Sequence, residues 1–256
     1  MGYEYHIEDN IIIFSFNNGK INSINTETLQ GLKEAVDRLN QEKELKGMVL
    51  TGAGKYFSGG FDLGTFTSFT SAQEIKEWFA YEEDVLLQVF TCPKPVVAAI
   101  NGHATAAGMI FSMACDYRLV MNNPKIKLGM TEIKIGLALS PTQGEIMRFG
   151  LDTDKKFRDM IFKGELINPA TAVELGILDE LVETPEELIS RAKEQVCAYI
   201  DTPGRPFMML KFLEKIHAAD YCEAGLKRYD WDILVKTFTD ENVINTLKMV
   251  KAALGA

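Results

Sequence analysis

The sequence KPVVAAINGHATAAGM, residues 94–109, indicates the class of fold. It begins with a short apolar run, Pro95 to Ile100, which predicts a buried strand. A turn of small residues follows and leads directly into a second apolar run, Ile110 to Cys115. Small residues let the backbone turn sharply and approach a ligand, with amide N–H groups left free to bind it. The stretch therefore predicts a strand and a turn that can present backbone donors.

A second stretch of this kind precedes the first in the chain. Residues 52–63, GAGKYFSGGFDL, directly follow a predicted strand at Gly47 to Leu50. Two such turns, brought together, would supply two amide donors to one developing oxyanion. Taken singly, each turn is also typical of a plain connection between a strand and a helix. Neither has the spacing of a Walker loop or a dinucleotide-binding fingerprint.

Further strands and helices place these turns in an α/β architecture. Strands are predicted at 11–16, 116–121 and 177–182, and an amphipathic helix begins after Asn25, which is a plausible N-cap. Strands that alternate with helices favour largely parallel pairing. After residues 203–206 only helical patterns remain, and the expected helices cover 207–218, 223–237 and 240–253. We therefore expect a core at 1–202 and a C-terminal helical region at 203–256.

Composition excludes several classes of protein. The chain has 256 residues with 36 acidic and 27 basic groups, a net charge of −9 that argues against a nucleic-acid partner. No window approaches the roughly 18 to 20 apolar residues that span a bilayer, so no membrane partner is expected. The N-terminus carries acidic residues where a leader would be basic, and a cytoplasmic location is expected. The four cysteines lie far apart, which predicts small buried thiols and neither a zinc site nor a disulfide framework.

Together these motifs resemble the crotonase superfamily, also called the enoyl-CoA hydratase/isomerase family, over nearly the whole chain. The resemblance implies a spiral of strand-strand-helix repeats, a C-terminal helical region used in trimer formation, and acyl-CoA thioester substrates. It also implies a homotrimer or a dimer of trimers, with no metal and no cofactor, since CoA is part of the substrate. Five blocks carry it in order: residues 18–24 (NGKINSI), 57–63 (FSGGFDL), 94–104 (KPVVAAINGHA), 115–118 (CDYR) and 128–137 (LGMTEIKIGL).

Members of this family use two backbone amides to polarise the thioester carbonyl and stabilise the adjacent enolate. By position, the resemblance assigns these oxyanion donors to the N–H groups of Phe61 and Ala107. Preorganised donors of this kind are worth about 3 to 4 kcal/mol each in a dry site. The neighbouring Gly60 and Gly108 are expected to contact the substrate.

The acid/base residues depart from the hydratase pattern. A typical hydratase has two glutamates, and the first of those positions is Ile110 here, which cannot transfer a proton. The second is Glu132, for which apolar neighbours such as Met130 and Ile133 predict a raised pKa. One carboxylate is sufficient to move a proton from C2 to C4 of a 3-enoyl thioester. The resemblance therefore points to a Δ3,Δ2-enoyl-CoA isomerase, with Ile110 at the substrate.

Three alternatives remain open from the sequence. Glu132 is also typical of a solvated carboxylate at a helix start. A hydratase or another crotonase-type reaction would need a second carboxylate, and Glu145 is one candidate. The chain is also compatible with an acyl-CoA-binding relative that does not turn over. Asp62 is expected to cap a helix, Asp116 to be structural, and His103 to pack or form hydrogen bonds.

Substrate contacts are predicted on two further groups of residues. The aromatic residues between the two turns either cover the acyl tail or form the apolar face of a helix: Phe66, Phe69, Trp78 and Phe79. Lysines at family turns and on the last helix are candidates for binding CoA, although each is also typical of a solvated surface. These lysines are Lys20, Lys55 and Lys251, with Lys248 as a further possibility on the last helix.

Overall fold

The computed structural model describes residues 2–254 and contains a six-stranded sheet in the order β1-β2-β3-β5-β7-β10. Its first two strands pair antiparallel and the others pair parallel, as expected. The strands are β1 (Tyr3–Glu8), β2 (Ile11–Phe16), β3 (Gly47–Gly52), β5 (Val96–Ile100), β7 (Tyr117–Met121) and β10 (Glu180–Val182).

A second sheet has four short strands in the order β4-β6-β8-β9. They are β4 (Tyr56–Ser58), β6 (His103–Thr105), β8 (Leu128–Gly129) and β9 (Leu166–Ile167). The first three pair parallel, and β9 pairs antiparallel with β8. The chain passes from β3 to β4, from β5 to β6 and from β7 to β8, and helices follow each pair. This repetition is the expected spiral of strand-strand-helix units.

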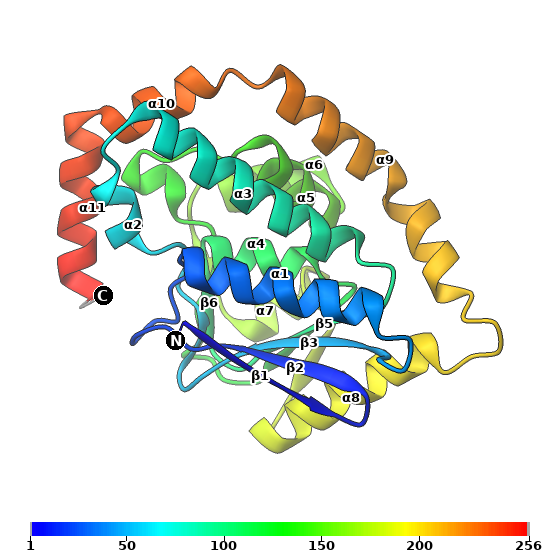
Figure 1. Cartoon of the computed structure of the whole chain (residues 1–256). Helices are drawn as coiled ribbons and strands as arrows, with labels where there is room; N and C mark the ends of the chain where they lie inside the picture. The colour runs from blue at the N-terminus through cyan, green and yellow to red at the C-terminus, as the bar shows by residue number, and fades with distance from the viewer. Residues whose placement is uncertain (1, 255–256) are drawn as a thin grey trace.

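Helices cover both faces of the six-stranded sheet (Figure 1). On one face lie α1 (Thr26–Gln41), α3 (Ala72–Thr91) and α4 (Ala107–Ala114), and on the other α8 (Pro185–Ile200) packs against Val49 and Val97. Because both of their faces are buried, the central strands β2, β3 and β5 are mainly apolar, whereas the edge strand β1 alternates with polar residues. In β2, Ile11 and Ile13 face α8, whereas Ile12 and Phe14 belong to the opposite core.

The C-terminal helices pack back on the core of their own chain (Figure 1). They are α9 (Phe207–Arg228), α10 (Trp231–Thr239) and α11 (Glu241–Leu254). In α9, the buried Lys211 and Lys215 place their Nζ atoms 2.6 and 2.7 Å from the two carboxylate oxygens of Asp116. Asp116 therefore has the structural role expected of it. Further along, α10 contacts α3, and α11 contacts α2 (Leu63–Ser68).

Two predicted boundaries in this part of the chain are wrong. The helix expected at 207–218 continues to Arg228, because Ala218 and Cys222 lie one turn apart on the buried face of α9 and hold it together. The next helix begins only at Trp231, after Asp230 accepts a hydrogen bond from the Asp232 N–H at 3.1 Å. The helix expected at 223–237 therefore has the wrong start.

The strand expected at 177–182 is also shorter than predicted and covers Glu180–Val182. The N–H groups of Ile177 and Leu178 donate to Ala172 O, in α7 (Pro169–Glu174), so this segment ends a helix and cannot pair in the sheet. Asn25 caps α1 as predicted and accepts a hydrogen bond from the Thr28 N–H at 2.9 Å.

The remaining expectations concern cysteines and membrane spans. The four cysteines are free, and three of them are buried: Cys92, Cys115 and Cys222. The fourth, Cys197, is half-buried on α8. Within residues 2–254, no helix combines the length and the apolar character that crossing a membrane requires.

Candidate active site

Three turns converge at one edge of the second sheet. Phe61 follows β4, Ala107 follows β6 and Glu132 follows β8. These strands pair parallel in the order β4-β6-β8, so their carboxyl ends lie side by side. Carboxyl ends of adjacent parallel strands are where α/β sheets place ligands. The fold therefore brings together three segments that are far apart in the sequence.

The first turn leaves the Phe61 N–H outside the sheet hydrogen bonds. Phe61 bridges Ile24, but the bonds of this bridge run from the Ile24 N–H to Gly60 O at 2.8 Å and from the Asp62 N–H to Ile24 O at 2.9 Å. Gly60 has φ of +109°, a conformation that L side chains rarely adopt. Asp62 caps α2 as predicted, since its carboxylate accepts from the Gly64 N–H at 2.9 Å.

The second turn presents the Ala107 N–H at the start of a helix. Ala107 is the first residue of α4, where an N–H has no partner within the helix. The preceding Ala106 has φ of 55° and donates its own N–H to Gly129 O at 3.0 Å. The second turn is thereby fixed to the end of β8, the strand that leads to Glu132.

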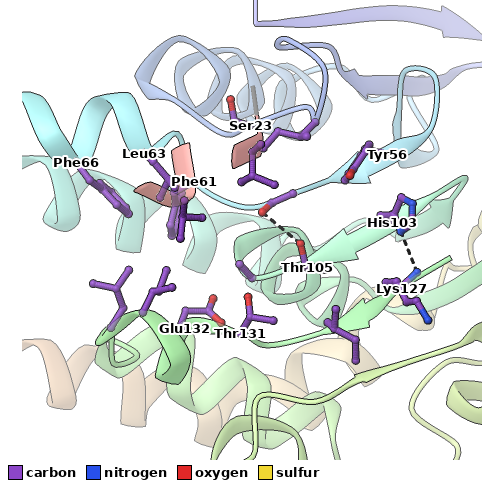
Figure 2. A pocket seen from close by; sticks show the side chains of 18 residues that line it. Ser23, Tyr56, Phe61, Leu63, Phe66, His103, Thr105, Lys127, Thr131 and Glu132 are labelled. Carbon is purple, nitrogen blue, oxygen red and sulfur yellow. Dashed lines mark hydrogen bonds between the residues drawn. The ribbon is translucent and has the colours of Figure 1, made fainter. Parts of the chain in front are cut away.

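The first and second turns are in contact. A Cβ atom placed on Gly60 would lie 3.5 Å from the Ala107 N atom. The Thr105 hydroxyl donates to Gly59 O at 3.3 Å and links the two turns (Figure 2). The turns that carry the Phe61 and Ala107 N–H groups therefore lie against each other.

Glu132 is half-buried and begins a 3-10 helix, η1 (Glu132–Ile135). Its Oε2 atom is buried and has no hydrogen-bond partner among residues 2–254. Burial raises the pKa of Glu132 to about 7, and the backbone N–H groups of Glu132 and Thr131 offset part of that rise. This is the raised pKa predicted from its neighbours, and it suits a residue that accepts and returns a proton near neutral pH.

A mainly apolar cavity of about 330 Å³, here called the first cavity, lies between these groups. Figure 2 shows Phe61 and Thr105 on one side of it and Glu132 and Thr131 on the other. Among the described residues that line it, Glu132 is the only carboxylate. Two residues of α11, Val250 and Leu254, close the cavity from the same chain.

Several predicted site residues are placed around this cavity. Glu132, Phe61 and Phe66 line it, and Gly60 and Ala107 belong to the turns at its wall. Gly108 and Ile110 are not among its described lining residues. Gly108 packs against the Ser58 carbonyl, where a Cβ atom would lie 2.3 Å from the oxygen, and Ile110 is buried in the core.

The aromatic residues between the two turns pack with Phe61 of the first turn and with Phe238 of α10. Together they form a cluster, here called the aromatic cluster: Phe61, Phe66, Phe69, Trp78, Phe79 and Phe238. Phe66 contacts the rings of Trp78 and Phe79 at centroid distances of 5.2 and 5.5 Å. Trp78 also donates its Nε1–H to Thr26 Oγ1 at 3.0 Å. Trp78 and Phe79 thus form the apolar face of α3, which is one of the two alternatives read from the sequence.

The three predicted CoA lysines are absent from the described lining of the first cavity. Lys20 is exposed on the loop between β2 and α1, and Lys55 is exposed directly before β4. Lys251 lies closer, since its Nζ atom would be 2.8 Å from a Cβ atom placed on Gly64, at the start of α2. The basic residue that lines the cavity is Lys127, whose backbone N–H donates to His103 Nδ1 at 3.0 Å.

Sequence reasoning missed several contributors to the site, among them the following four. Lys127 and Tyr56 line the cavity but belong to strand ends with no distinctive motif, and Val250 and Leu254 come from a helix remote in the sequence. The signal for Val250 and Leu254 is their spacing of four residues on one face of α11. That spacing shows that the two residues share a face, but not which surface it covers.

The segment after Glu132 is held in place by a buried acidic residue, Glu83. Its carboxylate accepts hydrogen bonds from the Thr142 N–H at 2.9 Å and from the Ser140 hydroxyl, at the start of α5 (Pro141–Gly150). An anionic acceptor at a helix N-terminus is stabilising. Glu83 thereby fixes the far end of the segment that carries Glu132. Glu145, the candidate second carboxylate, does not line the first cavity.

Comparison of the sequence with known protein families identifies the family of this chain. A family model described as enoyl-CoA hydratase/isomerase matches residues 6–249. The chain belongs to the enoyl-CoA hydratase/isomerase family. Its α/β spiral with a helical C-terminal region is therefore the fold of a family of enoyl-CoA enzymes.

Relatives in this family include proteins named hydratases and proteins named isomerases. The chain is 31% identical over 200 residues to a crotonyl-CoA hydratase of Syntrophomonas wolfei, covering 76% of this chain and 75% of the relative. It is 26% identical over 212 residues to mouse enoyl-CoA delta isomerase 1, mitochondrial, covering 82% and 72%. In fold, human mitochondrial Δ3,Δ2-enoyl-CoA isomerase superposes with a TM-score of 0.90 at 22% identity, covering 100% and 98%. The family's acyl-CoA chemistry is common to all three.

Proposed function

We propose that this enzyme is a Δ3,Δ2-enoyl-CoA isomerase, which moves a double bond of an acyl-CoA thioester from the 3- to the 2-position. The observation that carries the proposal is the single carboxylate, Glu132, on the described wall of the first cavity. One carboxylate can remove a proton and return the same proton at another carbon. Hydration would require a second group to activate a water molecule.

In the proposed reaction, the thioester oxygen accepts hydrogen bonds from the Phe61 and Ala107 N–H groups. The Glu132 carboxylate removes a proton from C2, and the electron pair spreads over the oxygen, C2 and C4 as a dienolate. The protonated Glu132 then delivers this proton to C4, and the double bond forms between C2 and C3. No atom is gained or lost, so the reaction as written uses no metal and no cofactor beyond the CoA of the substrate.

The apolar surroundings of Glu132 support this cycle. A pKa of about 7 means that neither the carboxylate nor the carboxylic acid is strongly favoured at neutral pH. A proton shuttle needs both states in each turnover, so this balance keeps both transfers rapid. The buried Oε2 atom, which accepts no hydrogen bond from the described residues, is available to accept the substrate proton.

Hydration of a 2-enoyl-CoA is the second candidate function, and the relative named crotonyl-CoA hydratase favours it. Hydration needs a second carboxylate, and neither position 110 nor position 145 supplies one at the first cavity. Ile110 is 1% exposed within the core. Glu145 faces α9, where its charge contributes to the raised pKa of the Cys222 thiol. The chemistry of the described cavity therefore supports isomerisation over hydration.

The decisive experiment is to supply 3-hexenoyl-CoA and crotonyl-CoA separately and follow the consumption of each. We expect rapid conversion of 3-hexenoyl-CoA to the conjugated thioester and little hydration of crotonyl-CoA. A Glu132→Gln variant should lose activity by about 100- to 10,000-fold. Hydration of crotonyl-CoA without isomerisation would contradict the proposal. CoA binding with no turnover on a broad acyl-CoA panel would instead favour a non-catalytic relative.

We further propose a homotrimer, alone or paired into a dimer of trimers. The outer face of α9 supports self-association, because contact with another subunit would remove its large exposed apolar side chains from water. These side chains are Met209, Leu210, Phe212, Leu213 and Tyr221. Analytical ultracentrifugation of the purified enzyme would measure the assembly. A monomer at micromolar concentration would contradict this part of the proposal.

A further inference from the structure

A second cavity lies on the other side of Glu132 from the first. Its volume is also about 330 Å³, and Met130, Gly144, Phe157 and Phe162 are among its walls. Glu132 and Leu137 line both cavities, so the two spaces meet at the proposed proton shuttle. An engineered apolar cavity of about 150 Å³ binds benzene, so a space of this size can hold a longer hydrocarbon.

The chemistry of the second cavity fits a hydrocarbon chain. Apart from Glu132, its described walls are the apolar side chains and small residues of η1, α5 and α6 (Asp154–Ile161) with their flanking residues. A polar occupant would lose its water hydrogen bonds there without compensation. An alkyl chain would instead gain by leaving water.

The space predicted for the tail from the sequence is already occupied. The aromatic cluster fills the region between α2 and α3, and Phe66, Trp78 and Phe79 are 4%, 8% and 4% exposed. A chain could pass between these rings only if they separated, and close packing opposes such movement. The second cavity needs no such separation.

We propose that the second cavity holds the acyl chain beyond the reacting carbons and makes this enzyme selective for medium-chain thioesters. This inference rests on the proposed isomerase function for the position of the reacting carbons at Glu132. The thioester head lies at the Phe61 and Ala107 amides, C2 to C4 lie at Glu132, and the methyl end lies beyond Leu137. Substrates of six carbons or fewer leave much of the second cavity empty.

Gly144 offers a direct test, because it lines the second cavity and a Cβ atom placed on it would meet nothing within 4 Å. Gly144→Leu and Gly144→Phe add bulk to the cavity. Gly144→Ala is the matched control, since it changes helix propensity with little bulk. We expect kcat/KM for 3-hexenoyl-CoA to stay within about twofold in all three variants. For 3-dodecenoyl-CoA, kcat/KM should fall at least about tenfold in the Leu and Phe variants alone.

A binding measurement separates this inference from the proposed reaction. Saturated hexanoyl-CoA and dodecanoyl-CoA are titrated against the wild-type enzyme and the Gly144→Phe variant by calorimetry. The longer chain should bind the wild-type enzyme more tightly, and this advantage should disappear in the variant. That result would support the tail site even if no isomerisation were observed. An unchanged advantage of the longer chain in Gly144→Phe would overturn it.

Phe162→Ala provides a second variant with little risk to folding. Phe162 lines the second cavity but is 59% exposed, so its truncation leaves the core intact. It should weaken binding of dodecanoyl-CoA several-fold and leave binding of hexanoyl-CoA unchanged. Equal losses for both chain lengths in this variant and in Gly144→Phe would show a general disturbance of the site and overturn the proposal.

Discussion

Gly60 and Ala106 face each other so closely that a methyl group on Gly60 would stand 2.7 Å from the Ala106 Cβ. Real Cβ atoms essentially never approach a neighbour to within 3.0 Å. Both residues also have positive φ values, +109° and 55°. The spacing of the Phe61 and Ala107 amides that follow them therefore depends on glycine at position 60.

This contact predicts that Gly60→Ala separates the two oxyanion donors. Loss of one such donor typically lowers kcat by about 100- to 1,000-fold, and we expect a decrease of this size. Gly54→Ala is the matched control, because Gly54 also has positive φ, +67°, but no atom lies within 4 Å of its added Cβ. Steady-state kinetics on 3-hexenoyl-CoA would measure both. Equal activity of the two variants would contradict the assignment.

The raised pKa of Glu132 predicts a pH-dependent rate. Only the carboxylate can remove the C2 proton, so kcat/KM should fall about tenfold per pH unit below pH 7 and level off above it. The measurement is kcat/KM from about pH 5.5 to about pH 9. A profile that is flat across neutral pH would show that Glu132 does not act as the base.

The raised pKa of Glu132 also predicts that Glu132→Gln changes the free energy of unfolding relative to wild type. The native pKa is about 7 and the ordinary value is 4.5, so the native state retains a proton that the unfolded chain releases across this window. Stability therefore falls as pH rises from 4.5 to 7, by about 3 kcal/mol at most. Glu132→Gln should be more stable than wild type above pH 7, and the difference should disappear below pH 4.5. Urea unfolding at several pH values tests this, with the exposed Glu165→Gln as control.

The buried cluster of Asp116, Lys211 and Lys215 predicts a large loss of stability on removal of its carboxylate. Asp116→Ala leaves two buried ammonium groups without a counter-charge, and breaking such a pair costs about 3 to 5 kcal/mol. Urea unfolding measures the change. Asp159→Ala is the control, because Asp159 pairs with lysines at the exposed surface and its removal should have little effect. Equal effects of the two substitutions would contradict the role assigned to Asp116.

A fifth prediction concerns CoA binding by α11. Lys251 lies over the start of α2, whereas Lys248 on the same helix is exposed. Lys251→Ala should weaken CoA binding roughly threefold, and the effect should shrink as salt is added. Lys248→Ala is the matched control and should bind CoA as the wild type does. Identical affinities for the two variants would remove Lys251 from the CoA site.

Local features could be predicted from the sequence because their signals are local. The strands at Ile11–Phe16 and Val96–Ile100 are continuous apolar runs, which is how a strand buried on both faces is recognised. The small residues at 59–60 and 106–108 indicated the two turns, since few other residues allow such backbone conformations. The position of Glu132 came from the resemblance, and its raised pKa from the apolar residues on either side.

Other features depend on packing between distant segments. Strands of two or three residues, such as Leu128–Gly129, are too short to show any periodicity, so only the family resemblance implies the second strand of each repeat. The aromatic residues of α2 and α3 have the same spacing whether they line a tail pocket or pack together. Only their mutual distances decide between these alternatives. The second cavity is equally invisible in the sequence, because it requires η1, α5 and α6 to meet.

The position of α11 has a consequence for the active site. Val250 and Leu254 close the cavity of the chain to which they belong, although α11 is the last helix of that chain. The C-terminal helical region is therefore part of the wall of the active site as well as a cover for the core.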